Sequence, residues 1–188
     1  MSDKLILASG SPRRRELLSS MGYDFEVIVS EAEEMKSGDP ELLVTENAYL
    51  KAAAVAKSHP GRWVIGSDTL VFSDGEPLGK PRDAEDAARM LHALSGNTHA
   101  VYTGIALMKD ETVLKCCDRT EVTFETLTDE EIRRYIASGE PMDKAGAYAI
   151  QGLGNVYVKR ICGNYSNVIG LNTCLMKAML EKAGVSRD

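Results

Sequence analysis

Asp68 is the residue whose surroundings point most clearly to chemistry, because it follows the apolar run WVIG and a serine. A carboxylate in such a place is costly to bury unless it is paired or binds a cation. We expect Asp68 at the carboxyl end of a strand, where sites form in open α/β sheets. Glu34, in the sequence SEAEE, is the second acidic candidate. The alternatives are structural: a turn or helix cap for Asp68, and a solvated acidic face for Glu34.

Three lysines form a cationic group of candidates. Lys51 lies in a predicted helix and shares a face with Asn47 at the i,i+4 spacing. Lys80 lies in the loop GKPRD, and Lys144 begins KAGAYAIQGLG, whose glycines permit close approach of the backbone to a ligand. Each lysine alone is most simply a surface charge. Together with the carboxylates and the glycine-rich loops, they are what a triphosphate–metal complex requires.

The segment ASGSPRRR combines the end of a strand, the start of a helix and consecutive arginines. Ser11 can cap this helix with Pro12 at its first position, because the missing N–H of proline costs nothing there. Backbone N–H groups at a helix start favour a phosphate, and arginines add bidentate donors. We therefore expect Ser9, Ser11, Arg13 and Arg14 to bind phosphate. The alternative is a capped surface helix with solvated arginines.

Alternating strands and helices must position these residues. A hairpin signal at Asp74-Gly75 and a capping box formed by Thr128 and Glu131 mark two of the boundaries. The sequence predicts one α/β domain over residues 1–188, with a mixed sheet flanked by helices and two lobes around a central cleft. Strands are predicted over residues 4–8, 24–29, 62–71, 99–108, 113–124 and 156–161, and helices over residues 12–21, 39–57, 83–94, 128–138 and 172–183.

The composition narrows the function classes. The net charge of −6 argues against broad binding to nucleic acid, but leaves room for a small anionic ligand in a local positive field. No apolar run approaches the roughly 20 residues that span a bilayer. The start of the chain lacks the features of a signal peptide, so we expect a cytoplasmic protein. The four cysteines form no CxxC motif and the three histidines are scattered, which disfavours a zinc cluster.

Five motifs, in this order, resemble the Maf family over nearly the whole chain: SGSPRRRELL, GSDT, GKPRD, LSGNTH and PMDKAGAYAIQGLG. The resemblance implies a cytosolic enzyme that hydrolyses nucleoside triphosphates to the monophosphate and pyrophosphate with a divalent cation, Mg²⁺ or Mn²⁺. It also implies an α/β fold with a cleft, related to that of the inosine-triphosphate pyrophosphatases, and it is compatible with a homodimer.

Three positions resemble the branch of the family that acts on dTTP and UTP. Arg13, Thr69 and Gln151 stand where the 7-methyl-GTP branch tends to carry tryptophan, glutamine and glutamate. Ser67 is a departure, because many dTTP/UTP members have alanine there. The Gln151 amide can match the O4 and N3–H edge of uracil or thymine, and Thr69 would line the same pocket.

The resemblance also implies roles for the charged residues. Asp68 would orient or deprotonate the attacking water or hold the metal, with Glu34 as the second metal ligand. A competing function is a nucleotide-sensing regulator of cell division without turnover, because the Maf name is associated with inhibition of septum formation. The cations expected to neutralise the triphosphate are Arg13, Arg14, Lys51 and Lys80, and Lys144 is a further substrate-binding candidate.

Overall fold

The computed structural model describes residues 4–186 and has a seven-stranded mixed sheet with helices on it. The strand order is β2-β1-β3-β5-β6-β7, with β4 paired to β3. The pairs of β1 with β2 and β3 are parallel, and the β3–β4 and β6–β7 pairs are antiparallel. The strands are β1 (Leu5–Leu7), β2 (Phe25–Val27), β3 (Val64–Ser73), β4 (Glu76–Leu78), β5 (Thr98–Lys109), β6 (Thr112–Phe124) and β7 (Val158–Cys162).

The predicted starts of several helices are confirmed. Ser11, Asp39 and Asn172 cap the first, second and last helices, and Thr128 with Glu131 forms the capping box. The predicted α/β class is confirmed. The α-helices are α1 (Pro12–Ser20), α2 (Pro40–Ala56), α3 (Ala84–Leu94), α4 (Asp129–Ala137), α5 (Tyr165–Ile169) and α6 (Thr173–Lys182), and the 3-10 turns are η1 (Glu140–Asp143), η2 (Ala145–Ala147) and η3 (Leu153–Tyr157).

The chain forms two compact units. The first contains the described residues up to Asp68, with Thr103–Asp118 and the described residues from Gly170 onward. The second contains Thr69–Tyr102 and Arg119–Ile169. The strands β3, β5 and β6 contribute residues to both units, and the single domain over residues 1–188 stays a prediction.

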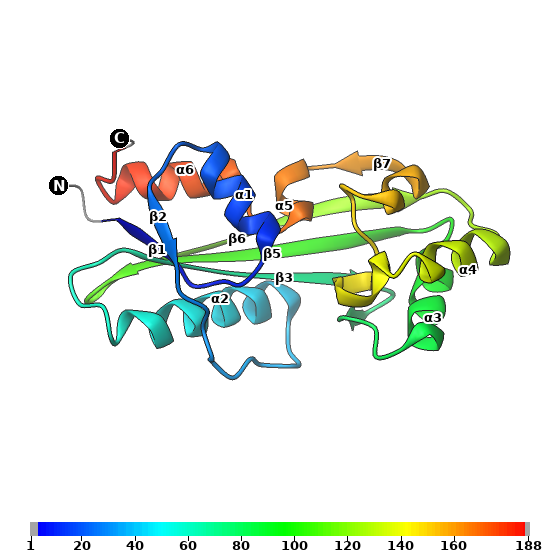
Figure 1. Cartoon of the computed structure of the whole chain (residues 1–188), viewed down its shortest axis with the longest axis horizontal. Helices are drawn as coiled ribbons and strands as arrows, with labels where there is room; N and C mark the ends of the chain where they lie inside the picture. The colour runs from blue at the N-terminus through cyan, green and yellow to red at the C-terminus, as the bar shows by residue number, and fades with distance from the viewer. Residues whose placement is uncertain (1–3, 187–188) are drawn as a thin grey trace. The chain divides into compact units, whose positions relative to one another are not determined.

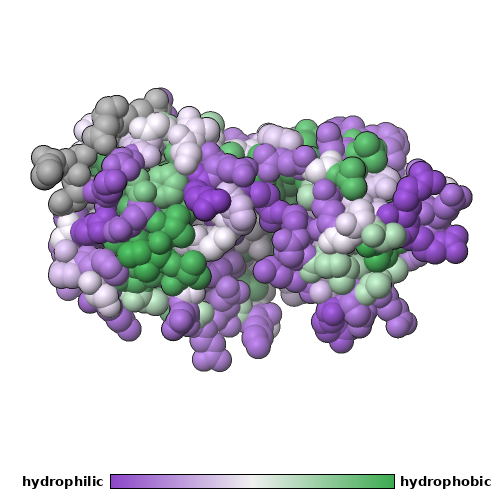
Figure 2. Space-filling model, in the orientation of Figure 1, coloured by the Kyte–Doolittle hydropathy of each residue, from purple (hydrophilic) through white to green (hydrophobic). Residues whose placement is uncertain are grey.

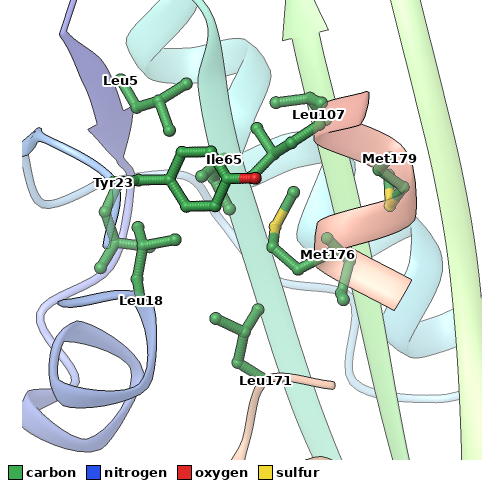
Figure 3. Close-up of a cluster of buried hydrophobic side chains, with 11 residues drawn as sticks. Leu5, Leu18, Tyr23, Ile65, Leu107, Leu171, Met176 and Met179 are labelled. Atoms are coloured by element: carbon green, nitrogen blue, oxygen red, sulfur yellow. The ribbon is translucent and has the colours of Figure 1, made fainter. Parts of the chain in front are cut away.

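The first unit has helices on both faces of its strands, with α2 on one face and α1 and α6 on the other (Figure 1). Because successive strand residues point to opposite faces, Leu5 and Leu7 join the cluster under α1 and α6, which Figure 3 shows. Ile6 and Ala8 join the cluster under α2. Both clusters consist of buried hydrophobic side chains, so this unit has a hydrophobic core on each side of β1.

Two glycines allow α2 to lie unusually close to the strands of the first unit. A Cβ atom on Gly66 would lie 2.0 Å from the carbonyl oxygen of Ala48. A Cβ atom on Gly104 would lie 2.3 Å from the carbonyl oxygen of Val44. Only a residue without a side chain fits at these positions, and this close packing fixes the distance between α2 and β3.

The second unit is held by α3, α4 and an aromatic cluster. The helix α3 contacts both α4 and η2. His99, Phe124 and Tyr148 pack edge to face, with ring centroids 4.8 to 5.4 Å apart. His99 is 2% exposed and its Nε2 atom lies 2.8 Å from the Tyr148 hydroxyl.

The edge strand β2 carries exposed apolar side chains in the first unit. Val27 and, just after the strand, Val29 are 40% and 61% exposed. Figure 2 shows apolar residues gathered over the part of this unit where β2 lies. The strand is only three residues long, which limits its pairing with another edge.

The structure corrects several predicted boundaries. The predicted strand over residues 24–29 is confined to Phe25–Val27. The stretch over residues 139–154, for which no helix or strand was predicted, contains η1 and η2 and runs into η3, and the short helix α5 was not predicted. Within residues 4–186, no helix is long and apolar enough to span a membrane.

Candidate active site

Lys51 lies between two carboxylates in the first unit. Its Nζ atom is 2.7 Å from Asp68 Oδ1 and 2.8 Å from Glu34 Oε1. The side chains of Lys51 and Asp68 are 14% and 15% exposed, so solvent screens their ion pair less than a surface pair. Glu34 is more open, with 51% of its side chain exposed. Three predicted site residues from separate segments of the chain therefore form one charged cluster.

Asn47 connects this cluster to the acidic segment before α2. It lies one turn before Lys51 on α2, and its Nδ2 group donates to Asp68 Oδ2 at 3.2 Å. The same amide accepts from the backbone N–H of Met35 at 2.8 Å and donates to the Met35 carbonyl at 3.0 Å. The segment that carries Glu34 is therefore held against α2. The i,i+4 spacing predicted the shared face of Asn47 and Lys51, but not the role of Asn47.

Asp68 lies inside a strand. We had expected it at the carboxyl end of that strand. The strand β3 continues through Ser73 to the turn at Asp74 and Gly75. The polar residues Ser67 and Asp68 do not end the strand, because each has a partner within the first unit. The expectation based on strand ends in open α/β sheets is wrong for this residue.

Arg14 is tied to the body of the first unit. Its Nη1 group donates to Ser9 Oγ at 3.1 Å, and its Nε group donates to the Gly170 carbonyl at 2.8 Å. Burial lowers the pKa of Arg14, and the Asp68 carboxylate opposes that shift. The buried Ser67 hydroxyl donates to the same Gly170 carbonyl at 3.0 Å. Ser67 thus has a structural partner that an alanine would lack.

Ser11 caps α1 as predicted, with its Oγ atom accepting from the Arg14 N–H at 3.5 Å. Its own backbone N–H donates to Ser9 Oγ at 3.3 Å. Ser9 Oγ therefore accepts from both a backbone group and the Arg14 side chain. Arg13 is half-buried on the same turn. The binding of phosphate by these four residues stays a prediction.

The loops that carry Lys80 and Lys144 are joined in the second unit. The backbone N–H of Gly146 donates to the Gly79 carbonyl at 3.1 Å. Lys80 is exposed, whereas the Lys144 side chain is 15% exposed and forms an ion pair with Asp143. The two lysines therefore lie on connected loops, one open to solvent and one already paired with a carboxylate.

Asp86 anchors the loop GKPRD to α3. Its Oδ2 atom accepts from the backbone N–H and the Nε group of Arg82, at 3.2 and 3.1 Å. Its Oδ1 atom accepts from Arg89 at 2.9 Å. The hydrogen bonds from Arg82 are the main cause that lowers the pKa of Asp86 far below its usual range. Arg82, which follows Lys80 and Pro81, is therefore held at the start of α3.

Two glycines near Gln151 face protein atoms. A Cβ atom on Gly152 would lie 1.9 Å from Glu140 Oε1, and one on Gly154 would lie 2.5 Å from the Tyr135 hydroxyl oxygen. The contacts with Glu140 and Tyr135 account for both glycines, and the close approach of a ligand to this backbone stays a prediction. The two glycines make room for two side chains of the same unit.

The proposed base-recognition residues lie in the second unit. Gln151 is exposed in the segment between η2 and η3, and Thr69 is half-buried in β3. Sequence reasoning missed Glu140 and Tyr135, which hold the Gln151 segment. No local signal could have found them, because their contacts depend on how α4 and η1 pack.

The carboxylates of Glu34 and Asp68 are compatible with a nucleotide-bound divalent cation. Among residues 4–186, no three His, Cys, Asp or Glu side chains are grouped to hold a metal ion by themselves. Mg²⁺ is usually bound by one or two carboxylates together with substrate phosphates, and it keeps several waters. Two carboxylates that converge on one cation, Lys51, fit that kind of site.

This chain matches a family model and is similar to several known proteins. The family model described as "Maf-like protein" matches residues 4–183. A protein of Bacillus cytotoxicus named dTTP/UTP pyrophosphatase is 53% identical over 170 residues, which cover 89% of this chain and 89% of the relative. A protein of Escherichia coli O157:H7 with the same name is 51% identical over 173 residues, covering 89% and 86%.

Proposed function

Because this chain belongs to the Maf family, we propose that it is a nucleoside triphosphate pyrophosphatase that hydrolyses dTTP and UTP to the monophosphate and pyrophosphate. Relatives at about half identity, from Bacillus and Escherichia, carry the name dTTP/UTP pyrophosphatase. The observation in the structure that carries the proposal is the cluster of Glu34, Lys51 and Asp68. Acidic and basic groups this close together suit a reaction at a phosphate anhydride.

Asp68 is the residue proposed to act on the attacking water. Hydrogen bonds from Lys51 and Asn47 fix both of its carboxylate oxygens, so the side chain is preorganised before a nucleotide binds. Lys51 can exchange a carboxylate partner for a phosphate oxygen, because its ammonium group is a compact donor on a flexible stem. Arg13, Arg14, Lys80 and Lys144 add the positive charge that a triphosphate requires.

A divalent cation, Mg²⁺ or Mn²⁺, is part of the proposal. Glu34 and Asp68 would hold it together with the phosphates of the nucleotide. When bound, such a cation withdraws charge from the phosphoryl oxygens and lowers the pKa of a bound water. Without it, the same two carboxylates would repel the substrate, and the positively charged side chains of the site would have to offset their charge.

Base choice is proposed to depend on Gln151 and Thr69. The Gln151 amide has a donor and an acceptor, which match the O4 and N3–H groups of uracil and thymine. Cytosine reverses the donor pattern at position 4 and would be rejected. The negative net charge supports a small nucleotide over nucleic acid as the ligand. A cytoplasmic location and a homodimer are further parts of the proposal.

Pyrophosphate release from a panel of nucleotides, with Mg²⁺ or Mn²⁺, tests the proposed function. We expect the wild type to act on dTTP and UTP, and Asp68→Asn to lose at least about 100-fold in kcat, because Asn cannot accept the proton. Asp74→Asn is the matched control, because Asp74 lies in the exposed turn after the same strand. Nucleotide binding without pyrophosphate release by the wild type would contradict the proposal, as would equal rates for wild type and Asp68→Asn.

A further inference from the structure

Glu140 is a partly buried carboxylate whose oxygens are used by the segment that carries Gln151. Its Oε1 atom accepts from the backbone N–H of Leu153 at 3.0 Å. Its Oε2 atom accepts from the backbone N–H of Gly154 at 3.1 Å and from the Tyr135 hydroxyl at 2.7 Å. Three donors therefore converge on one carboxylate at the start of η1.

Tyr135 holds the other end of the same segment. Its hydroxyl donates to Glu140 and accepts from the backbone N–H of Ala149 at 3.0 Å. The residue is 2% exposed on α4, and its ring packs edge to face on Tyr157, with centroids 5.3 Å apart. The two side chains thus bind the backbone on both sides of Gln151, at positions 149, 153 and 154.

The glycines of the QGLG sequence are required by this arrangement. Side chains at Gly152 and Gly154 would occupy the places of the Glu140 carboxylate and the Tyr135 hydroxyl. Gly152 has a negative φ angle of −109°, so a left-handed backbone is not what requires a glycine at this position. The absence of a side chain there serves the contact with Glu140.

The carboxylate of Glu140 is stabilised in its charged form. Burial by itself would raise its pKa, but the hydrogen bonds from Tyr135, Leu153 and Gly154 outweigh burial and lower the pKa below its ordinary value. A charged acceptor makes stronger hydrogen bonds than a neutral one. The Glu140 carboxylate therefore serves as a hydrogen-bond acceptor for the segment that carries Gln151, and not as a group that transfers protons.

We infer that Glu140 and Tyr135 are positioning residues that hold residues 149–154 in the conformation from which Gln151 reads the pyrimidine base. The inference rests on the proposed function, because it assigns these residues to substrate choice at the same site. Glu140 acts through the backbone that carries Gln151, and not on the phosphates.

The variants Glu140→Gln and Tyr135→Phe test this inference. Glutamine replaces one acceptor oxygen by a donor that faces a backbone N–H or the tyrosine hydroxyl, and phenylalanine leaves the Ala149 N–H without its acceptor. We expect KM for dTTP to rise about tenfold and the preference for dTTP over CTP to fall, with kcat within about twofold of wild type. Amide hydrogen exchange at Leu153 and Gly154 should be faster in Glu140→Gln.

Matched controls separate positioning from general destabilisation. Glu130→Gln removes a carboxylate that is 76% exposed and paired with Arg134, and Tyr157→Phe removes a hydroxyl directed at a backbone carbonyl of α4. Both should keep the substrate preference of the wild type. In the double variant with Gln151→Ala, Glu140→Gln should add little, because both changes act on one interaction.

The two possible failures give different results. A wild type that releases no pyrophosphate from dTTP or UTP contradicts the proposed function. A wild type that is active, beside variants that keep its KM, its dTTP-to-CTP preference and its amide exchange rates, overturns the inference alone. Effects of Glu140→Gln and Gln151→Ala that simply add would also overturn it, because independent sites are additive.

Discussion

At the scale of single residues, Asn47 is a buried amide that supports the charged cluster of Glu34, Lys51 and Asp68. It is 2% exposed and connects the Met35 backbone, through its amide, to the Asp68 carboxylate. Both of its N–H donors and its oxygen are used within the first unit. A buried amide with this many partners fixes a single arrangement, because each partner would be left unsatisfied if it moved.

We expect Asn47→Ala to lower the free energy of unfolding by about 2 to 3 kcal/mol, because it removes the three hydrogen bonds that the buried Asn47 amide makes to Met35 and Asp68. Pyrophosphate release should fall at least about tenfold, since Glu34 and Asp68 both lose support. Urea unfolding and initial rates with dTTP measure the two effects. Asn97→Ala, which removes a single exposed hydrogen bond to Ala93, is the control. Full activity of a folded Asn47→Ala protein would show that Asn47 has no part in the site.

At the scale of elements, the contact between α2 and the strands decides whether the charged cluster forms. Lys51 and Asn47 are on α2, and Asp68 is on β3. Their contacts require the short distance that Gly66 and Gly104 permit. The alanines of α2 at the same interface add little bulk, so the helix backbone lies nearly against the sheet.

Gly66→Ala tests this close approach. The new Cβ atom would lie 2.0 Å from the Ala48 carbonyl oxygen, so α2 must move and carry Lys51 away from Asp68. Overpacking of this kind typically costs about 1 to 3 kcal/mol, and we expect at least that loss together with a large loss of turnover. Thermal unfolding measures the stability. Gly79→Ala is the stability control, because its Cβ atom would meet nothing within 4 Å. Equal melting temperatures for the two variants would count against the packing argument.

At the scale of the whole molecule, the buried imidazole of His99 links folding to pH. Burial lowers its pKa from 6.5 to about 4. The unfolded chain therefore takes up a proton as pH falls below 6.5, whereas the folded protein takes it up only near pH 4. Between these values the unfolded state binds more protons, so the stability contributed by neutral His99 is lost as pH falls.

We expect the free energy of unfolding to fall by about 3 kcal/mol on this account between pH 6.5 and about 4. Urea unfolding at several pH values across this window measures the fall. His99→Gln cannot take up the proton, so its stability should depend less on pH, although carboxylates contribute to both proteins. If the free energy of unfolding falls equally with pH in wild type and His99→Gln, His99 is not the cause of the fall.

Much of the fold could be predicted from the sequence, because its signals are local. Ser11, Asp39 and Thr128 cap helices through hydrogen bonds to groups two or three residues away. The turn at Asp74 and Gly75 places both residues at positive φ, which their types tolerate. The shared face of Asn47 and Lys51 follows in the same way from helix periodicity.

The caps, the turns, the order of most elements and the residue types suited to phosphate chemistry follow from the amino-acid sequence alone. The tertiary structure, by contrast, brings Lys51 to both Asp68 and Glu34. It also decided that the QGLG glycines face Glu140 and Tyr135. These contacts join residues that are separated along the chain: Lys51 and Asp68 are 17 residues apart, and their contact exists only because helix and sheet pack at one particular distance.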